Sequence, residues 1–294
     1  MARRTEFRIV VGVDGSAHAR AALATVVEGP WPDSTRVLVV VAKQTRLPHR
    51  HSILLAALDR SAEDAAARAR RTLAPRWPDA QIMVVDKAPV EAIVGEAIRF
   101  GADLIVVGWR GHGPARRLLM GSVSRSVIRK AKCAVLVVRR RPRGPVRNIV
   151  LAFDEGPYAR RAVSLVARLS PIAGGRVTLF HAVDLLAPTS RGPVVGGIRA
   201  SVGHELKRIN AGRSNAAKQA LTRVARELNR SGWRTQIALR TGEPLRELID
   251  TVGKSNADLV IVGARGTRMV RHLLLGSVAE GALNLSPVPV LLAR

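Results

Sequence analysis

The sequence has few of the residues that several classes of protein depend on. A single cysteine, Cys133, excludes an internal disulfide and is typical of a reducing compartment. Because it lies just before an apolar run, we interpret it as a buried or half-buried, unreactive thiol. Aromatic residues make up only 3% of the chain, so stacking platforms for single-stranded nucleic acid are scarce. No apolar run approaches the ~20 residues of a membrane helix. We therefore expect a cytoplasmic protein without a membrane partner.

Acidic residues are also scarce relative to basic ones. The chain has 22 Asp and Glu against 48 Lys and Arg, which gives a net charge of +26. Such a charge favours an anionic partner, for example a nucleotide or a nucleic acid. The excess is spread over both halves of the chain rather than gathered in one arm, so nucleic-acid binding is the less favoured alternative. Hydrophobic residues make up 47% of the 294 residues, enough for the cores of two domains.

An internal repeat organises the chain. The segment ADLIVVGWRG at residues 102–111 returns as ADLVIVGARG at residues 257–266, an offset of 155. Residues 8–14 match residues 148–154 with an offset of 140, so the second half contains an insertion of 15 residues. We expect this insertion in the Gly- and Pro-rich stretch 184–203, which is typical of a loop.

A short connector separates the two copies. Residues 139–145 read RRRPRGP, a composition that favours an extended, self-repelling linker over an ordered element. The sequence therefore predicts a first domain over residues 1–141, a linker over 142–147 and a second domain over 148–294.

Each half alternates short β-branched runs with longer helical patterns, which predicts βαβ units and a parallel sheet. The middle runs are apolar throughout, as expected when both faces of a sheet are covered. The expected fold is α/β, with two Rossmann-like domains in tandem. In the first half the expected strands are 8–13, 36–42, 81–86, 103–108 and 134–138, and the expected helices are 60–74 and 90–100.

Two loops in each half are candidates for a ligand site, because ligands of open parallel sheets bind beyond the carboxyl ends of the strands. One follows the first strand and begins with Asp14 or Asp154. The other follows the fourth strand and has glycines at fixed spacing, Gly-x2-Gly-x9-Gly-Ser. Glycine lets the backbone approach a ligand, and successive N–H groups at a helix N-terminus bind phosphate. Loop arginines could add positive charge: Arg110, Arg116, Arg117, Arg265, Arg268 and Arg271.

Each of these features also has a purely structural interpretation. A glycine after a strand is often only a turn, and a serine before a helix is often only an N-cap worth about 1 kcal/mol. Asp14 could itself cap the first helix. The joint spacing, present twice in one chain, is what favours a binding site.

That spacing, downstream of a first strand that ends in Asp, resembles the ATP-binding signature of the universal stress protein family. The resemblance covers both halves and implies two domains of five parallel strands with helices on both faces, similar to the adenine nucleotide alpha hydrolases. It implies ATP, with or without Mg2+, as the ligand of a regulatory stress-response protein. The matching positions are Val13, Asp14, Ala42, Gly108, Gly111, Gly121, Ser122, Val123 and Ser124 in the first half, and Asp154, Gly263, Gly266, Gly276, Ser277 and Val278 in the second.

The second half departs from the first at the motif. Gly15 is replaced by Glu155 and Arg125 by Glu280, which places carboxylates where phosphates would lie. The hydroxyl of Ser124 is lost at Ala279. We therefore expect the first domain to bind ATP more tightly.

Dedicated catalysis is not expected, because the chain has no Walker-type GxxxxGK[ST] loop and no positioned base. A slow ATP-hydrolysing or nucleotide-processing enzyme stays an alternative, as does a nucleotide-independent protein-interaction module. Members of the family commonly pair through the edge strand of the sheet. The resemblance therefore implies that residues 135–138 lie beside residues 290–293, and that a homodimer of the whole chain could also form.

Overall fold

The computed structural model describes residues 6–43, 52–111, 120–184, 196–266 and 275–294. Ten strands form one continuous sheet in the order β3-β2-β1-β4-β5-β10-β9-β6-β7-β8. Within each half, the paired strands are all parallel. The two predicted five-stranded sheets are therefore confirmed. The strands are β1 Arg8–Val13, β2 Arg36–Ala42, β3 Gln81–Val85, β4 Leu104–Gly108, β5 Ala134–Val138, β6 Asn148–Ala152, β7 Arg176–Val183, β8 Arg234–Thr241, β9 Leu259–Gly263 and β10 Val290–Ala293.

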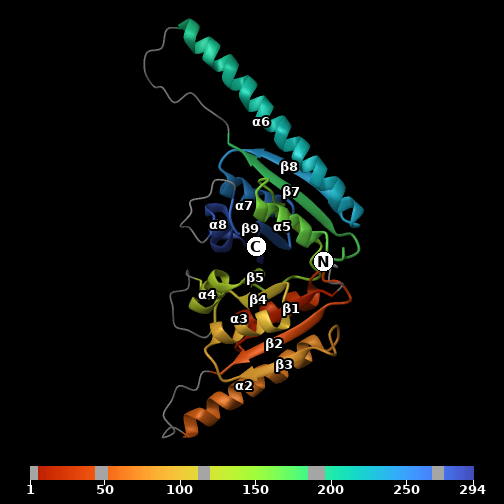
Figure 1. Cartoon of the computed structure of the whole chain (residues 1–294), viewed down its shortest axis with the longest axis vertical. Coiled ribbons are helices and arrows are strands. Elements are labelled where there is room, and N and C mark those ends of the chain that lie inside the picture. Colours follow the sequence, from red (N-terminus) through yellow and green to blue (C-terminus); the bar gives the residue numbers. More distant parts are fainter. Residues whose placement is uncertain (1–5, 44–51, 112–119, 185–195, 267–274) are drawn as a thin grey trace.

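Helices cover both faces of this sheet (Figure 1). One core packs α1, α2, α5 and α6 against the sheet, and a second core packs α3, α4, α7 and α8 against the other face. In β1, Ile9 and Val11 belong to the first core and Val10 to the second, as the two-residue period of a strand requires. The helices are α1 Ala17–Glu28, α2 Ser52–Leu73, α3 Pro89–Phe100, α4 Ser122–Lys130, α5 Pro157–Val166, α6 Gly196–Arg230, α7 Pro244–Lys254 and α8 Ser277–Leu285.

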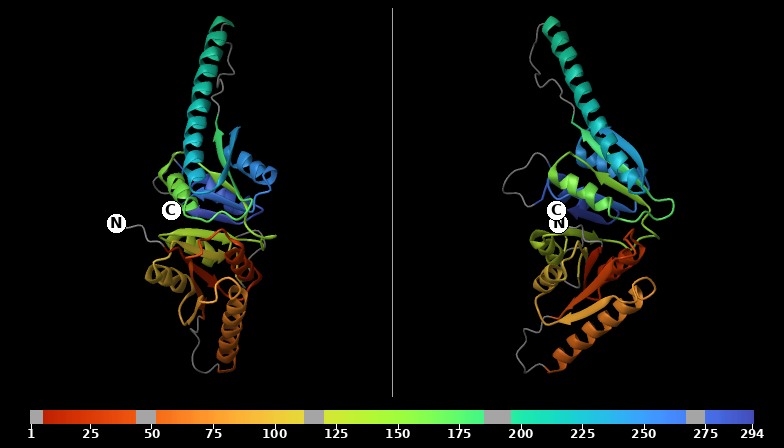
Figure 2. Two further views of the ribbon diagram at one scale, coloured as in Figure 1. Left: turned by 90° about the vertical axis from the view of Figure 1, so that its right-hand side faces the viewer. Right: turned by 45° about the vertical axis from the view of Figure 1, so that its right-hand side comes forward.

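The halves join through their last strands. β5 and β10 pair antiparallel, with Leu136 opposite Leu291 at the middle of the register and both side chains fully buried. This confirms that residues 135–138 lie beside 290–293. Figure 2 shows the resulting elongated molecule, with the junction at its waist.

Two arginines reinforce the junction in a reciprocal way. Arg139, just after β5, donates from Nη1 to the carbonyl of Asn284 near the end of α8, at 3.1 Å. Arg294, just after β10, donates to the carbonyls of Ile128 and Ala131 at the end of α4. Each half thus places a cation at the C-terminus of the other half's last helix, where the helix dipole favours positive charge.

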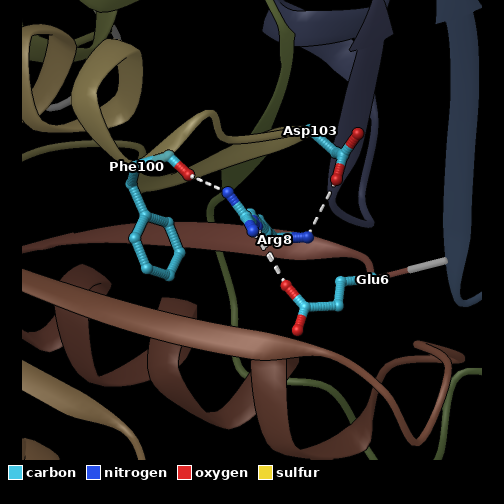
Figure 3. A network of polar contacts seen from close by, with 4 residues as sticks. All are labelled: Glu6, Arg8, Phe100 and Asp103. Carbon is cyan, nitrogen blue, oxygen red and sulfur yellow. Dashed lines mark hydrogen bonds and ion pairs between the residues drawn. The ribbon is translucent and has the colours of Figure 1, made fainter. Parts of the chain in front are cut away.

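A second polar contact between the halves centres on Asp103. Its Oδ2 accepts from the backbone N–H of Arg8 at 2.9 Å (Figure 3). Its Oδ1 accepts from Nη1 of Arg168, in the second half, at 2.9 Å. The Arg8 side chain donates to Glu6 and to the carbonyl of Phe100, so the start of β1 is fixed from both sides.

The expected elements agree with the structure except in two helices. α2 begins at Ser52, eight residues before the expected start at 60. The stretch 184–203 is not simply a loop, because residues 196–203 belong to α6, a helix of 35 residues against 22 in α2. Figure 1 shows α6 extending far beyond the sheet. The insertion therefore lengthens a helix, and residues 185–195 lie outside the described part. Within the described ranges, no helix combines the length and apolar character needed to cross a membrane.

Candidate functional site

In both halves the two candidate loops meet at the carboxyl end of the sheet. β1 lies between β2 and β4, and β6 lies between β7 and β9. After the central strand of each half, the chain forms strands on one side of it first and later returns to form strands on its other side. The point between these two sides is the topological switch point, where such sheets bind ligands. The Asp loops follow β1 and β6, and the glycine loops follow β4 and β9.

The Asp loops have a common geometry. Oδ1 of Asp14 accepts from the N–H of Ser16 at 3.0 Å, and Oδ1 of Asp154 accepts from the N–H of Gly156 at 3.0 Å. Asp14 does not cap the first helix, because Ser16 is the N-cap and its Oγ accepts from the N–H of Ala19 at 3.1 Å. The structural alternative for Asp14 is therefore corrected in favour of Ser16.

The first glycine of each motif lets a helix approach the sheet. A Cβ added to Gly108 would lie 2.7 Å from the carbonyl carbon of His18, and one added to Gly263 would lie 2.9 Å from Cβ of Tyr158. Real side chains do not tolerate such contacts, so any other residue would push α1 or α5 away.

The second glycine of each motif faces the Asp loop. A Cβ on Gly111 would lie 2.3 Å from Oδ2 of Asp14, and one on Gly266 would lie 2.9 Å from Oδ2 of Asp154. The second glycine of the motif thus allows the glycine loop to pack directly against the Asp loop. A purely structural role of these glycines is therefore supported, because they are needed for packing whether or not a ligand binds.

The last helix of each half begins as expected. α4 has Gly121 as its N-cap and α8 has Gly276, and neither helix has a side-chain cap. The first-turn N–H groups are therefore not satisfied by a capping side chain, which is the arrangement that binds phosphate. Ser122 and Ser277 are both exposed at this position, and Val123 and Val278 follow half-buried.

Ser124 does not behave as expected. Its side chain is 4% exposed and its Oγ donates to the carbonyl of Gly108 at 2.6 Å. The hydroxyl ties α4 to the end of β4 and does not point to a phosphate. The Ser-to-Ala difference at Ala279 therefore removes a structural hydrogen bond rather than a ligand contact.

The second half encloses a cavity of about 600 Å³ between these loops. Its volume lies within the ~300–1,000 Å³ typical of small-molecule sites. It brings together the predicted residues Asp154, Gly263, Gly266, Gly276, Ser277 and Val278, and also Phe153 and Ala182, which correspond to Val13 and Ala42.

In the first half, Val13 ends β1 in a buried position and Ala42 ends β2 half-buried. Asp14 and Gly111 are exposed beside them, and Gly108 is buried. The loop arginines Arg110 and Arg265 follow the strand ends in both halves. The other loop arginines, Arg116, Arg117, Arg268 and Arg271, lie outside the described residues.

Among the lining residues that were not predicted as site residues, three are polar and lie outside both motif loops. His181 donates from Nδ1 to the carbonyl of Phe153 at 2.6 Å, which leaves Nε2 as its other polar atom. Arg213 comes from the inserted part of α6, and Asp184 follows β7. The 140-residue offset pairs His181 with Val41, so this difference could have been found by comparing the halves.

Titration at the first-half site is affected mainly at His18. Burial, followed by the charge of Arg110, lowers the pKa of His18 below its usual value. In the part of the chain that the structure describes, no three His, Cys, Asp or Glu side chains gather closely enough to hold a metal ion.

A protein-family comparison matches this chain twice. The model described as the universal stress protein family matches residues 7–139 and residues 145–294. The matched segments correspond to the two halves of the sheet and together span nearly the whole chain.

Relatives with the same tandem length exist. A universal stress protein of Mycobacterium tuberculosis is 25% identical over 99% of this chain and 98% of its own length. A crystal structure of a universal stress protein from Archaeoglobus fulgidus covers 98% of this chain and 96% of its own, with 18% identity and a TM-score of 0.63. The latter likeness supports the fold. A second solved universal stress protein, 31% identical over 45% of this chain and 96% of its own, with a TM-score of 0.31, was crystallised in complex with cAMP.

Proposed function

Because the chain belongs to the universal stress protein family, with two of its domains in tandem, we propose that it is an ATP-binding regulatory protein. It acts in the cytoplasmic stress response, without a dedicated catalytic apparatus. Nucleotide binding would shift an equilibrium between conformations or partners by the difference in affinity for the two states. A homodimer of the whole chain is part of this proposal.

One observation carries the proposal. In the second half, the Asp loop and the glycine loop line the same cavity of about 600 Å³, and the N-terminus of α8 opens onto it with no side-chain cap. This arrangement offers backbone donors for phosphate and apolar walls from Phe153 and Val262 for a base. The same loops recur in the first half around Asp14 and Gly121.

The predicted site residues contact different parts of the nucleotide in this proposal. The N-termini of α4 and α8 receive the phosphates, with Ser122 and Ser277 exposed at their first positions. Asp14 accepts from the ribose or base, or shares the divalent cation of Mg2+–ATP. Val13 and Ala42 line the base pocket.

The first half is proposed as the tighter site. Glu155 is exposed in the Asp loop of the second half, and Glu280 is exposed in the first turn of α8. Both carboxylates repel a polyphosphate, and Gly15 and Arg125 stand in their places in the first half. The corrected role of Ser124 removes one argument for this ranking and leaves the electrostatic one.

The test is calorimetric titration of ATP, with and without magnesium, into the wild type and a Gly121→Val variant. A Cβ at Gly121 already lies 3.2 Å from Cα of Arg110, so valine narrows the phosphate cradle. Gly144→Val is the matched control, because nothing lies within 4 Å of that position. Circular dichroism of both variants checks that they fold.

We expect about one tight site per chain, lost in Gly121→Val and kept in Gly144→Val. Equal occupancy of both halves would contradict the ranking of the sites. Absence of binding in the wild type would favour the nucleotide-independent alternative. Turnover of ATP that Gly121→Val abolishes would favour the enzyme alternative.

A further inference from the structure

A second cavity lies at the junction between the halves, and it shares only Ala264 and Arg265 with the glycine loop of the second half. Its volume is about 270 Å³, near the lower end of the range for small-molecule sites. α4 and the turn after it contribute one wall, α5 contributes another, and the ends of β9 and β10 close it. The lining residues are Arg129, Ala131, Lys132, Tyr158, Arg161, Ala264, Arg265 and Arg294.

Five of these lining residues are cations and none is a carboxylate. Among the ion pairs formed by the described residues, none uses Arg129, Lys132 or Arg161. Asp103, which acts electrostatically on the neighbouring Cys133, is held by Arg8 and Arg168. The like charges of Arg129, Lys132 and Arg161 repel one another, and an anion between them relieves that cost.

Arg294 is the most constrained of the five. Two of its nitrogens donate to carbonyls at the end of α4, and its Nε is buried without a hydrogen-bond partner. Burial, with a smaller contribution from the charge of Arg265, lowers its pKa below the usual value. A buried donor without a partner is costly, so this side chain leaves one hydrogen bond unmade beside the cavity.

The repeat allows an internal comparison, because the equivalent residues of the opposite halves form a second corner of the junction, around α8 and α1. There Arg110 and Arg139 stand in place of Arg265 and Arg294, and both act on the pKa of His18, which replaces Tyr158. The other three cations have neutral counterparts: Asn284 for Arg129, Pro287 for Lys132 and Ala21 for Arg161. The fold and the reciprocal caps therefore account for two of the five cations, and the other three have no cationic counterpart in that second corner. One of them, Arg161, lies over the ring of Tyr158, with its Cζ 5.3 Å from the ring centroid.

We propose that this junction cavity is a binding site for a multivalent phosphate anion, either free or as the phosphate tail of a nucleotide. Three guanidinium groups and one ammonium group converge on it besides the capping Arg294. Guanidinium forks recognise phosphate oxygens in pairs, and the ammonium adds a compact charge. Because α4 belongs to the first half and α5 to the second, the anion would bridge the two halves. This inference does not rest on the proposed nucleotide function.

The test is calorimetric titration of inorganic tripolyphosphate into the full chain. The site variant carries Arg129→Gln, Lys132→Gln and Arg161→Gln, none of which lines the nucleotide cavity or caps a helix at the junction. The control variant carries Arg71→Gln, Arg223→Gln and Arg226→Gln, three exposed cations on α2 and α6. Both variants lose the same charge, so only the location differs.

We expect the site variant to weaken tripolyphosphate binding at least about tenfold and the control to bind as the wild type does. Equal weakening in both variants would show diffuse attraction to a basic surface and overturn the proposal. Tripolyphosphate binding that is unchanged in the site variant, or absent from the wild type, would also overturn it.

A parallel titration with ATP identifies the source of the phosphate. If the site variant keeps all of its ATP binding, the junction takes free phosphate anions. If it loses one of two ATP sites, the junction takes the nucleotide's tail. Failure of ATP to bind the wild type at all would count against the proposed function and leave the tripolyphosphate result intact.

Discussion

Glu155 has a backbone conformation that glycine adopts more easily. Its φ is 63°, and its counterpart in the first half is Gly15 with φ 80°. A non-glycine residue in this region costs about 1–2 kcal/mol, while glycine costs roughly 0.5–1 kcal/mol in unfolded-chain entropy. We expect Glu155→Gly to raise the free energy of unfolding by about 0.5–1 kcal/mol, measured by urea denaturation.

The reverse substitution in the first half is the control for this prediction. Gly15→Glu should lower the free energy of unfolding by a similar amount, about 0.5–1 kcal/mol, because it introduces the strain that Glu155→Gly removes. Destabilisation by Glu155→Gly together with stabilisation by Gly15→Glu would show that charge, and not backbone strain, controls this loop.

Cys133 provides a second prediction for a single residue. Burial raises the pKa of its thiol to about 11 from a usual 9.0. The folded state therefore keeps its proton where the unfolded chain loses it, so stability should fall as pH rises above about 9. At pH 8 the folded thiol should react with iodoacetamide about 100-fold more slowly than the thiol of the urea-unfolded chain.

A Cys133→Ala variant is the control for the pH dependence. It should lose the part of the stability decrease that belongs to the thiol, while the part caused by other groups remains. Equal alkylation rates in the folded and unfolded chains would contradict the buried environment. The same result would make Cys133 a candidate reactive residue.

Single residues were the hardest part of the site to predict. The spacing of Gly108, Gly111 and Gly121 locates the loops, because glycine has few other reasons to recur at fixed distances. The partner of a hydroxyl depends on packing that the sequence does not contain. Ser124 could therefore be placed at the start of α4 but not on the carbonyl of Gly108. Ser16, and not Asp14, proved to be the cap for the same reason.

At the level of elements, the reciprocal arginines should stabilise α4 and α8 unequally. Arg294 donates to two carbonyls of α4, and Arg139 to one carbonyl of α8. A hydrogen bond from a charged group contributes about 1.5–3 kcal/mol when buried and less when exposed. We expect Arg294→Gln to lower the free energy of unfolding by roughly 1–3 kcal/mol and Arg139→Gln by less, in guanidinium denaturation.

Lysine variants at the same positions distinguish capping from charge alone. Arg294→Lys keeps the positive charge near the helix dipole but cannot span both carbonyls, so it should recover only part of the loss. Full recovery by lysine would mean that the dipole interaction, and not the pair of hydrogen bonds, holds the junction.

Helix α6 shows why one element escaped prediction. The glycines at 196, 197 and 203 and the preceding prolines favour a loop. The alanine-rich turns that follow propagate a helix backward through these three glycines, because each added residue contributes a hydrogen bond after nucleation. The strands were easier, since runs such as Leu104–Gly108 are buried on both faces and apolar throughout.

At the level of the whole molecule, the repeat predicted the architecture better than any single motif. Two copies of an open sheet have four edge strands, and pairing one edge strand of each copy within the chain leaves only two edges exposed. The structure confirms this pairing between β5 and β10. Strands β3 and β8 are then the outer edges of the sheet. A homodimer would have to use those edges or the helical faces, and it stays a prediction.

The continuous sheet predicts that the two halves unfold together. One core contains residues of both halves, and Leu136 faces Leu291 across the junction at 0% exposure. Three tryptophans lie in the first half and Trp233 alone in the second. A Trp233→Phe chain therefore reports on the first half, and a chain that keeps only Trp233 reports on the second. We expect the same urea midpoint from both reporters.

Breaking the junction should uncouple the halves. Leu136→Asp with Leu291→Asp buries two facing carboxylates, whose desolvation and mutual repulsion oppose pairing of β5 with β10. We expect the two reporters then to give separate midpoints, because each half keeps most of its own two cores. Separate midpoints in the unsubstituted chain would show that the junction transmits too little energy for cooperative unfolding. In that case the halves would behave as independent domains. Ligand binding to one half would then not change the stability or affinity of the other through the sheet.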